Sequence, residues 1–441
     1  MKYLVVAFLL IPALVQAQNV QSGPMLGYNQ MREVAIWIQL DAEATVEASY
    51  WLKDSRVPSM TSEPIQANRE NAFTATLICD RLEPGMTYGY TFMIDGKQLE
   101  LNDSWEFTTQ PLWQFRTDPP EFSIAAGSCA YINEDAYDRP GDPYGGDYQI
   151  FDNIATKNPQ LMIWLGDNTY LREADWASKS GVLHRYTHTR SCPEMQTLLK
   201  SCHHYAILDD HDFGPNDSNG SWIYKDFTRE AFEMFWANPT YGAPEVDGLI
   251  TQFSYADIDF FMLDNRTFRT DHNIKGVKET ILGKEQKKWL IQALERSQAP
   301  FKMVAIGGQF ISDAAVYENY SQYEDERKEL IDLITRNNIR GVIFLSGDRH
   351  SAELSVLELD NGNMIYDLTS SPLTSTAYDH GDEPNTFRVD GTMYGERNFA
   401  TISFSGPRMD RKAYIQLFDS NGKQVWDYAI TQANLSSKKK K

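Results

Sequence analysis

Acidic residues gather directly after an apolar run in residues 205–217, which read YAILDDHDFGPND. Asp209, Asp210 and Asp212 follow the run almost without interruption, and His211 lies among them. Carboxylates this close repel one another and resist losing water, so the arrangement is unfavourable unless a cation offsets their charge. A bound metal ion is the expected cation.

Two further aspartates follow apolar runs at Gly-Asp turns. Asp167 lies in WLGDNTY, just before Tyr170, and Asp348 lies in SGDRH, just before His350. Taken singly, such an aspartate often caps a helix, and a lone histidine is more often structural than a ligand. Because the Gly-Asp turn recurs and the acidic stretch accompanies it, the sequence predicts one metal site that these strand ends share.

Cys129 ends the run FSIAAGSC and adds a different kind of ligand. A disulfide is the alternative, but Cys192 and Cys202 lie close together and could close a loop with each other, while Cys79 alternates with apolar residues as a core thiol does. Thiolate and phenolate are strong donors to a trivalent ion, whereas carboxylates alone suit a hard divalent cation such as calcium. The predicted cluster therefore contains two kinds of ligand set.

Six apolar runs end in this way, and helical patterns such as GKEQKKWLIQALERS lie between them. The runs are FSIAAGSC, LMIWLGDNTY, YAILDDHD, DFFMLDNR, KMVAIGGQF and VIFLSGDRH. Strands that are buried on both faces read this way, and the ligand sites of α/β sheets gather beyond the carboxyl ends of the strands. The sequence predicts an α/β domain over residues 120–435, with a β-sheet core flanked by helices and one shared site.

The preceding residues, 18–119, alternate at period two, as in EVAIWIQL and YGYTFMID. Such alternation between turn residues predicts a small antiparallel β-sandwich. The turn LEPG followed by Tyr88 resembles the tyrosine-corner segment of fibronectin type III-like domains. Pro119 and Pro120 mark a linker, so the 441 residues are expected to form two domains.

The two ends and the net charge bear on location and partners. Residues 1–17 contain one lysine and an apolar stretch, which predicts a secretory signal cleaved after Ala17 and a periplasmic or extracellular protein. No later segment is apolar enough to cross a bilayer, so an integral membrane protein is not expected. The formal charge of -20 disfavours a stable nucleic acid complex. Residues 436–441, SSKKKK, are expected to be a solvated tail, and oligomeric state has no signature in the sequence.

The motifs GSC, GDNTY, DDHD, LDNR and GDRH occur in an order that resembles the PhoD-like alkaline phosphatases and phosphodiesterases of the metallophosphoesterase superfamily. The resemblance covers most of the chain. Like those enzymes, the chain departs from ordinary metallophosphoesterases, because a cysteine lies in the first block and Asp348 replaces the first histidine of the last. The resemblance implies a metallophosphoesterase-type β-sheet core behind the β-sandwich.

The resemblance also implies two metal sites and their ligands. A ferric-type site would use Cys129, Asp167, Tyr170 and His350. A second site, calcium in the best-known member type, would use a bridging Asp167 together with Asp210 and Asp348. His211 would face the phosphate, and Asn216 would add an oxygen ligand or contact the substrate. Manganese or zinc could bind the same ligands instead.

Arg266 and Gln309 end two further strands of the predicted core. The guanidinium fork of Arg266 matches phosphate oxygens, and a salt bridge to the acids of the cluster is the alternative. Gln309 occupies a block where many relatives have a metal-binding histidine, so we expect it to hydrogen-bond a ligand or substrate. Asp209 and Asp212 could instead orient the other ligands.

The residues and the resemblance together predict a secreted alkaline phosphatase of PhoD type that hydrolyses phosphate esters with metal-activated water. His211 and Arg266 would stabilise charge on the phosphoryl group or the leaving oxygen. A phosphodiesterase or phospholipase D-like enzyme with the same site is the alternative. The non-enzymatic alternative is a secreted binding protein in which the metal is structural.

Overall fold

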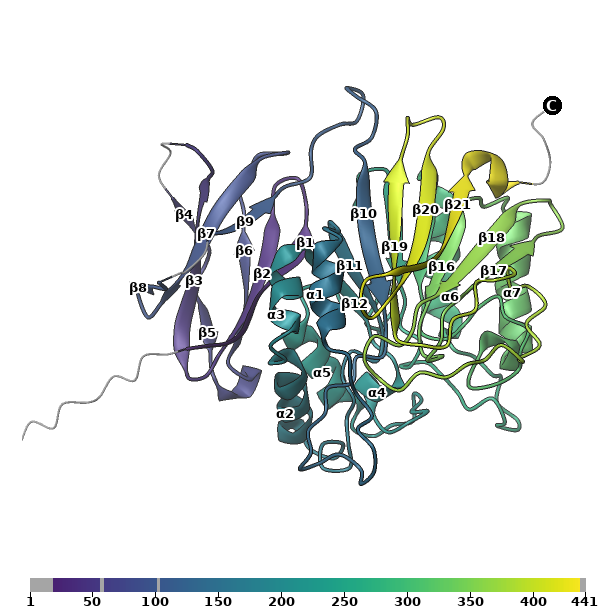
Figure 1. The fold of residues 1–441 in the computed structure, drawn as a ribbon, viewed down its shortest axis with the longest axis horizontal. Coiled ribbons are helices and arrows are strands. Elements are labelled where there is room, and N and C mark those ends of the chain that lie inside the picture. The colour runs from purple at the N-terminus through teal and green to yellow at the C-terminus, as the bar shows by residue number, and fades with distance from the viewer. Residues whose placement is uncertain (1–18, 56–58, 101–103, 437–441) are drawn as a thin grey trace, which may run out of the picture.

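The structure is a computed structural model that describes residues 19–55, 59–100 and 104–436 (Figure 1). The predicted signal segment lies outside the described residues, and so does the Lys-rich tail apart from Ser436. Among the described helices, none has both the length and the apolar character that a membrane span needs.

Strands of the main body form two sheets. The first contains, in spatial order, β21 (Gln424–Thr431), β20 (Lys412–Asp419), β19 (Asn398–Ser405), β10 (Phe122–Gly127), β11 (Leu161–Leu165), β12 (His203–Ile207), β1 (Val20–Asn29), β2 (Val34–Leu40) and β6 (Thr74–Cys79). The second contains β13 (Thr251–Tyr255), β14 (Ile258–Met262), β15 (Lys302–Ala305), β16 (Val342–Ser346), β18 (Met364–Thr369) and β17 (Glu353–Glu358). One apolar core, which includes Ile124, Ile163, Met303 and Leu345, contains residues of both sheets.

Helices cover the outer faces of these sheets (Figure 1). The α-helices are α1 (Gln149–Thr156), α2 (Lys179–Arg190), α3 (Met195–Ser201), α4 (Asp210–Phe213), α5 (Lys225–Phe235), α6 (Gly283–Arg296) and α7 (Glu324–Arg336). Short 3-10 turns are η1 (Arg69–Asn71), η2 (Tyr320–Gln322) and η3 (Gln432–Leu435). The buried positions of α6, among them Leu290, Ile291 and Leu294, recur at helical spacing and pack with Val304 of β15 in one apolar cluster. The predicted α/β class is confirmed.

All six predicted apolar runs contain strands of these two sheets. They correspond to β10, β11, β12, β14, β15 and β16, and the consecutive members of each sheet are paired in parallel. Every residue of β11, β12 and β16 is buried, as expected for strands covered on both faces. Parallel pairing brings the carboxyl ends of these strands to one edge of the body, where the polar residues that follow them meet.

The N-terminal residues form a sandwich whose sheets are only partly separate from the main body. A third sheet contains, in spatial order, β4 (Met60–Thr61), β3 (Ala44–Leu52), β7 (Thr87–Ile94) and β8 (Lys97–Gln98). In the same sheet, β5 (Ile65–Ala67) pairs with β3 and β9 (Trp105–Thr108) pairs with β7. This sheet faces β1, β2 and β6, which continue the first sheet through a parallel pairing of β1 with β12 at Leu26 and His203. The hydroxyl of Tyr88 accepts a hydrogen bond from the backbone N–H of Glu83 at 2.8 Å, as in a tyrosine corner.

The four cysteines are all buried free thiols. Cys79 packs in the core of the sandwich, as predicted. The possible disulfide between Cys192 and Cys202 is not formed, because each thiol has a different neighbour. The sulfur of Cys192 lies 3.3 Å from a carboxylate oxygen of Glu194, and that of Cys202 lies 3.7 Å from Nε2 of His204.

Candidate metal centre

Within each of the two sheets, the loops that follow neighbouring parallel strands are joined by close backbone contacts. The N–H of Ala130 donates to the carbonyl of Asp167 at 2.8 Å, and the N–H of Gly347 donates to the carbonyl of Gly307 at 2.6 Å. A Cβ atom on Gly307 would lie only 2.4 Å from Oδ2 of Asp209, so this approach requires glycine. Gly307 follows β15 of the second sheet and Asp209 follows β12 of the first, so their close approach brings the carboxyl ends of the two sheets together.

Four of the predicted ligands and the turns that present them have left-handed backbone conformations. The φ angles are 60° for Cys129, 51° for Asp167, 63° for Asp348 and 54° for His350. Non-glycine residues rarely adopt this conformation, and its concentration at one place is typical of functional sites. Each strand thus ends in a sharp turn that points its next side chain toward the shared rim.

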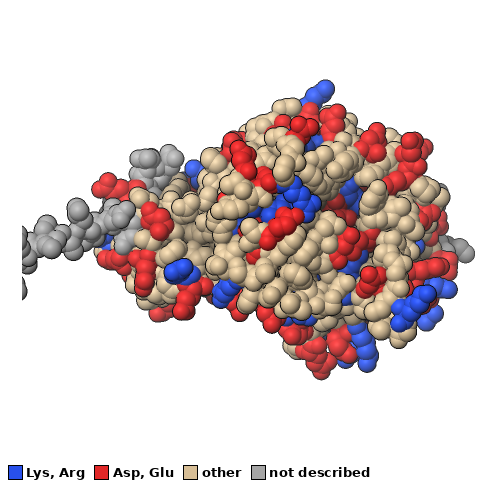
Figure 2. All heavy atoms as spheres, turned by 90° about the horizontal axis from the view of Figure 1, so that it is seen from below, with Lys and Arg blue, Asp and Glu red and all other residues tan. Residues whose placement is uncertain are grey.

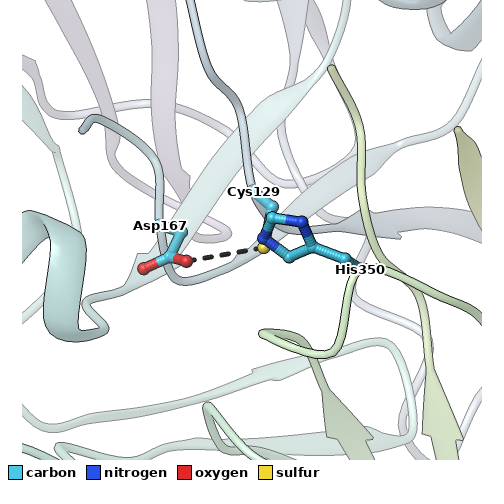
Figure 3. Close-up of side chains that lie close together, drawn as sticks. All are labelled: Cys129, Asp167 and His350. Carbon is cyan, nitrogen blue, oxygen red and sulfur yellow. Dashed lines mark hydrogen bonds between the residues drawn. The ribbon is translucent and has the colours of Figure 1, made fainter. Parts of the chain in front are cut away.

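The first group of candidate ligands contains Cys129, Asp167 and His350, whose side chains lie close together (Figure 3), and Tyr170 adjoins it. The thiol of Cys129 lies 3.5 Å from Oδ2 of Asp167, and the hydroxyl of Tyr170 lies 3.2 Å from the same oxygen. Tyr170 is also 3.4 Å from Nε2 of His350. Nδ1 of His350 contacts the carbonyl of Thr376, which can only accept, so Nδ1 holds the proton and the Nε2 lone pair faces the group.

Two serine hydroxyls surround the sulfur of Cys129. Ser371 donates to it at 3.2 Å and Ser128 at 3.4 Å. Burial nevertheless raises the pKa of the thiol to about 12, and the charge of Asp348 acts in the same direction. Without a cation this cysteine is therefore a neutral thiol, and the serines favour the thiolate that a metal ion would require.

An acidic group adjoins the first one through Asp167. Ligand atoms of Asp167, Asp210 and His211 lie within 4.8 Å of one another, and so do those of Asp209, Asp210 and Asp348. Burial, followed by the charge of Asp210, raises the pKa of Asp167 well above its usual range. Burial and the charges of Asp209 and Asp210 raise the pKa of Asp348 to about 7. The protein therefore provides too little positive charge around Asp167 and Asp348 to offset their burial and mutual repulsion.

Several polar atoms of this site have no hydrogen-bond partner among the residues that the structure describes. Oδ2 of Asp209, Oδ1 of Asp210 and Nδ1 of His211 are buried and form no hydrogen bond within the described part of the chain. Buried polar atoms without partners are costly, and a metal ion or its ligands would satisfy them. The thiol, phenol and imidazole of the first group suit a Lewis-acidic ion, and the carboxylates of the second suit a hard divalent cation. The residues present therefore fit two adjoining metal sites.

Asp209 and Asp212 lie behind these ligands and hold the turn of α4. Oδ1 of Asp212 accepts from the backbone N–H groups of Asn168 and Thr169 at 3.0 and 3.1 Å, and its Oδ2 accepts from the N–H of Asp209 at 2.9 Å. Burial raises the pKa of Asp212 to about 8. Its contacts join the turn that contains Asp167 to the turn that contains Asp210.

Arg266 does not reach the substrate side, and the alternative of a salt bridge to the acids is the one observed. It is 1% exposed and donates through Nε to Asp209, while Nη1 donates to Glu318 at 2.8 Å and to the carbonyl of Ser218 at 3.2 Å. Its Nη2 lies 3.8 Å from Oδ1 of Asp210. The guanidinium thus supports the acidic group from behind.

Gln309 is likewise turned away from any ligand. Its Nε2 donates to Glu353 at 2.6 Å and to the hydroxyl of Thr369 at 3.0 Å, and its Oε1 accepts from Asn319 at 3.0 Å. It is 3% exposed and does not line a described cavity. The prediction of a substrate contact is wrong, because the amide is saturated by neighbouring side chains.

Four of the candidate ligands, Asp167, Asp210, Asp348 and His350, line a cavity of about 940 Å³, whose wall also includes Tyr317, Tyr378 and Asn216. His211 and Asn216 border both this cavity and a second one of about 590 Å³. The ring of His211 lies 4.2 Å from that of Tyr170, and burial lowers the pKa of His211 to about 4. His211 and Asn216 therefore lie beside a space that a ligand could occupy.

Four residues of these cavity walls were not singled out from the sequence. Glu318 and Asp217 extend the acidic group beyond Asp210, and their ligand atoms lie within 4.8 Å of one another. Arg349 donates to Glu383 at 2.7 Å and lies 5.0 Å from the ring centre of Tyr317. Arg172 lines the second cavity. Arg349 lies inside the motif GDRH, which was the available signal, whereas Glu318 follows no recognisable motif.

Charged groups on the face seen in Figure 2 are mixed, with acidic side chains spread over the body and smaller groups of basic ones between them. This distribution agrees with the formal charge of -20. An anionic substrate must therefore be attracted by local cations of the site itself.

Comparison with known proteins places this arrangement in a family. The model of the PhoD-like phosphatase family matches residues 124–406, and the model of a domain of unknown function, DUF7800, matches residues 17–112. Alkaline phosphatase D of Bacillus subtilis (strain 168) is 24% identical over 349 residues, which cover 67% of this chain and 55% of that protein. The chain thus spans about half the length of this curated relative.

Two solved structures have the same fold. A structure of PhoD matches with a TM-score of 0.74 and 17% identity over 91% of each chain. The purple acid phosphatase PPD1 from yellow lupin (Lupinus luteus) matches with a TM-score of 0.67 and 12% identity, over 92% of this chain and 73% of the other. They confirm the metallophosphoesterase-type fold. Because the family match also covers more than half of the 441 residues, the chain belongs to the PhoD-like phosphatase family.

Proposed function

We propose that this chain is a metal-dependent phosphoester hydrolase that releases phosphate from phosphate esters, as an alkaline phosphatase of PhoD type does. The observation that carries the proposal is the junction of two ligand groups at Asp167. One oxygen of this carboxylate faces Cys129 and Tyr170, and ligand atoms of Asp167 and Asp210 also lie within 4.8 Å of each other. Both groups border a cavity large enough for a phosphate ester.

We assign Fe³⁺ to the group that contains Cys129, Tyr170 and His350, and Ca²⁺ to the acidic group that contains Asp210 and Asp348, with Mn²⁺ or Zn²⁺ as substitutes. The mixed donor set supports this assignment. When bound, the metal ions supply positive charge for the phosphoryl oxygens and make the attacking water more acidic. Asp167 is the ligand that both sites would share.

In the reaction, the oxygen of water forms a new bond to phosphorus, the ester P–O bond breaks, and the alcohol leaves with a proton. His211 borders both cavities and can donate a hydrogen bond to a phosphoryl or leaving oxygen. Asn216 lies at the same border and is exposed to ligand. Arg266 acts indirectly, because its contacts with Asp209 and Glu318 fix the acidic group.

A phosphodiesterase or phospholipase D-like activity is the second candidate. The second cavity favours it, since a diester has two substituents on phosphorus and the two cavities meet at Tyr144, His211 and Asn216. A secreted binding protein with a structural metal site is the non-enzymatic candidate. Its metal sites would be closed by protein ligands, whereas these border a cavity.

We also propose that the protein is exported to the periplasm or the extracellular space. The stretch MKYLVVAFLLIPALVQA supports this, because it has the composition of a secretory signal. Sequencing the N-terminus of the purified mature protein tests it, and a mature chain that begins at Met1 would contradict export by cleavage.

Elemental analysis of protein purified without chelator, together with hydrolysis of p-nitrophenyl phosphate and bis-p-nitrophenyl phosphate, tests the function. We expect iron and calcium, hydrolysis that EGTA abolishes, and recovery when calcium is restored. The ratio of the two rates separates phosphatase from phosphodiesterase. A folded protein that contains metal, or regains it, yet hydrolyses neither ester would support the binding protein instead.

A further inference from the structure

Arg172 is a nearly buried cation in the wall of the second cavity. It follows Tyr170 closely in the motif GDNTYLRE, is 7% exposed, and lines the cavity of about 590 Å³ that adjoins the metal centre. A guanidinium is always charged and carries five N–H donors, so its burial is unfavourable unless an anion or hydrogen-bond acceptors replace the water.

Protein contacts hold Arg172 without neutralising it. Its Nε donates to the hydroxyl of Tyr131 at 2.9 Å, and its guanidinium carbon lies 4.6 Å from the ring centre of Tyr131 and 5.8 Å from those of Tyr144 and Tyr170. The hydroxyl of Tyr131 in turn donates to Asp138 at 2.7 Å. Three aromatic rings and one hydroxyl thus fix the guanidinium in place.

No carboxylate of the described residues lies within 4.0 Å of the guanidinium nitrogens of Arg172. Other buried arginines of the site differ, because Arg185 pairs with Asp175, Arg266 with Asp209, and Arg349 with Glu383. The chain therefore supplies an acid to each of these arginines and leaves the remaining donors of Arg172 to the cavity.

The acids that line the second cavity do not pair with the guanidinium of Arg172. Asp138 is engaged by Tyr131 and by the backbone N–H of Glu134, and Asp135 and Asp142 are exposed. The other arginine of the cavity, Arg139, is exposed and already pairs with Glu173 at 2.7 Å. Arg172 is accordingly the cation best placed to receive an anion from the cavity.

The position of Arg172 separates it from the phosphoryl site. It lines the second cavity but not the first, where Asp210, Asp348 and His350 lie. His211 and Asn216 border both spaces, so a phosphoryl group at the metal ligands would direct one substituent past them toward Arg172. The anion that fits Arg172 is thus a second group of the substrate.

We propose that Arg172 recognises an oxyanion on the alcohol part of the substrate, a carboxylate or a second phosphate-like group, so that the preferred substrates are phosphate esters with an additional negative group. A guanidinium fork binds such oxyanions with two parallel hydrogen bonds. This inference rests on the proposed phosphoester hydrolysis for its place in the reaction, and it makes Arg172 a residue of substrate specificity.

The test compares phenyl phosphate with 4-carboxyphenyl phosphate and 4-sulfophenyl phosphate, which add a planar or a tetrahedral oxyanion. For each protein, kcat/KM for an oxyanionic substrate is divided by kcat/KM for phenyl phosphate. We expect Arg172→Gln to lower this ratio by about tenfold or more. The matched control, Arg139→Gln, removes a cation of the same cavity that is already paired, and should leave the ratio unchanged within about twofold.

An equal loss on all three substrates, or an unchanged ratio, would overturn the proposal. Calorimetric binding of phenylphosphonate and 4-carboxyphenylphosphonate separates this failure from that of the proposed function, because phosphonates need no turnover. If the protein hydrolyses none of the esters, the affinity ratio of the two phosphonates still tests Arg172. A preference for the carboxylated phosphonate that Arg172→Gln abolishes supports the inference, and equal affinities in the unaltered protein overturn it.

Discussion

Arg266 and Asp209 form an ion pair in which both side chains are 1% exposed. Asp209 also accepts from Asn265 at 2.8 Å, and Arg266 also donates to Glu318 at 2.8 Å, so the pair is the centre of a buried polar network. This network lies directly behind the acidic group of the metal centre. Removal of one member leaves the other as an unpaired buried charge.

Arg266→Ala should therefore destabilise the protein by about 3 to 5 kcal/mol, because it leaves the buried Asp209 without a cation, whereas Glu318 keeps its pair with Arg269 at 2.9 Å. Urea unfolding measures the change. The control is Arg139→Ala, which breaks an exposed pair with Glu173 and should cost less than about 1 kcal/mol. If Arg266→Ala kept full stability and only raised KM, Arg266 would be a substrate contact after all.

Cys129→Ser should remove the proposed iron while the fold is retained, because a hydroxyl is a much weaker ligand than a thiolate for this type of site. Iron content per chain and the visible absorption expected from thiolate and phenolate bound to Fe³⁺ are the measurements. Cys202→Ser alters a buried thiol in the helical core and should retain the iron. Iron that remained stoichiometric in the Cys129 variant would exclude the thiolate as a ligand.

Acid should weaken the junction between β1 and β12. Burial lowers the pKa of His203 to about 4, although its hydrogen bond to the carbonyl of Gly27 acts in the opposite direction. Since an unfolded histidine titrates near about 6.5, the unfolded state binds the extra proton between these values, and stability falls as the pH decreases. The contribution of His203 is fully present above about pH 6.5 and is lost down to about pH 4.

Urea unfolding at several pH values tests this dependence. His203→Gln should reduce the slope of the unfolding free energy between pH 6 and pH 4.5 by up to about 1.4 kcal/mol per pH unit. His184→Gln, which removes a half-exposed imidazole from another element, is the matched substitution for comparison. An unchanged slope in the His203 variant would mean that other groups determine the acid sensitivity.

Trp37 should contribute to the stability of the main body as well as to that of the sandwich. Its indole N–H donates to the carbonyl of Met234 at 2.8 Å, and its ring lies 5.7 Å from that of Phe235 in α5. Trp37→Ala should cost about 3 to 5 kcal/mol and lower the single unfolding transition of the whole chain. Trp51, which is 37% exposed, serves as the control, and its change to Ala should have a much smaller effect.

Two separate unfolding transitions, of which Trp37→Ala affected only one, would show that the sandwich is independent. The same result would predict that residues 120–435 fold without the N-terminal strands. The shared core predicts the opposite, because Met25, Ala35 and Trp37 pack in one apolar cluster with the helices of the main body.

The clustering of the candidate metal ligands could be predicted because its signals are local. Apolar runs such as LMIWL and VIFLS indicate strands buried on both faces, and the next residues, Asp167 and Asp348, must then lie at strand ends. Parallel pairing then brings the carboxyl ends of neighbouring strands to one edge of the sheet. The direction of Arg266 could not be read in this way, since an arginine after a strand can point into the cavity or behind it, and Asp209 from another strand decides which.

Other features depend on partners that are distant in the sequence. The amide of Gln309 is saturated by Glu353, Thr369 and Asn319, which lie on three later segments. The alternation of β1 and β2 indicates a sandwich strand, but the same pattern suits a strand that extends the main sheet. Arg172 follows a ligand motif, yet its lack of an acidic partner appears only when the folded surroundings are known.

The order of the strands in the first sheet has a consequence for biosynthesis. β1 borders β12, which is made much later, and β10 lies between β11 and β19, which is close to the C-terminus. Ser371, a donor to the sulfur of Cys129, is also one of the later residues. During translation the edges of the early strands therefore remain unpaired until the later strands have been synthesised, and exposed edges of this kind promote aggregation. A chaperone that holds the nascent chain until β19 emerges would protect the protein at its most vulnerable stage.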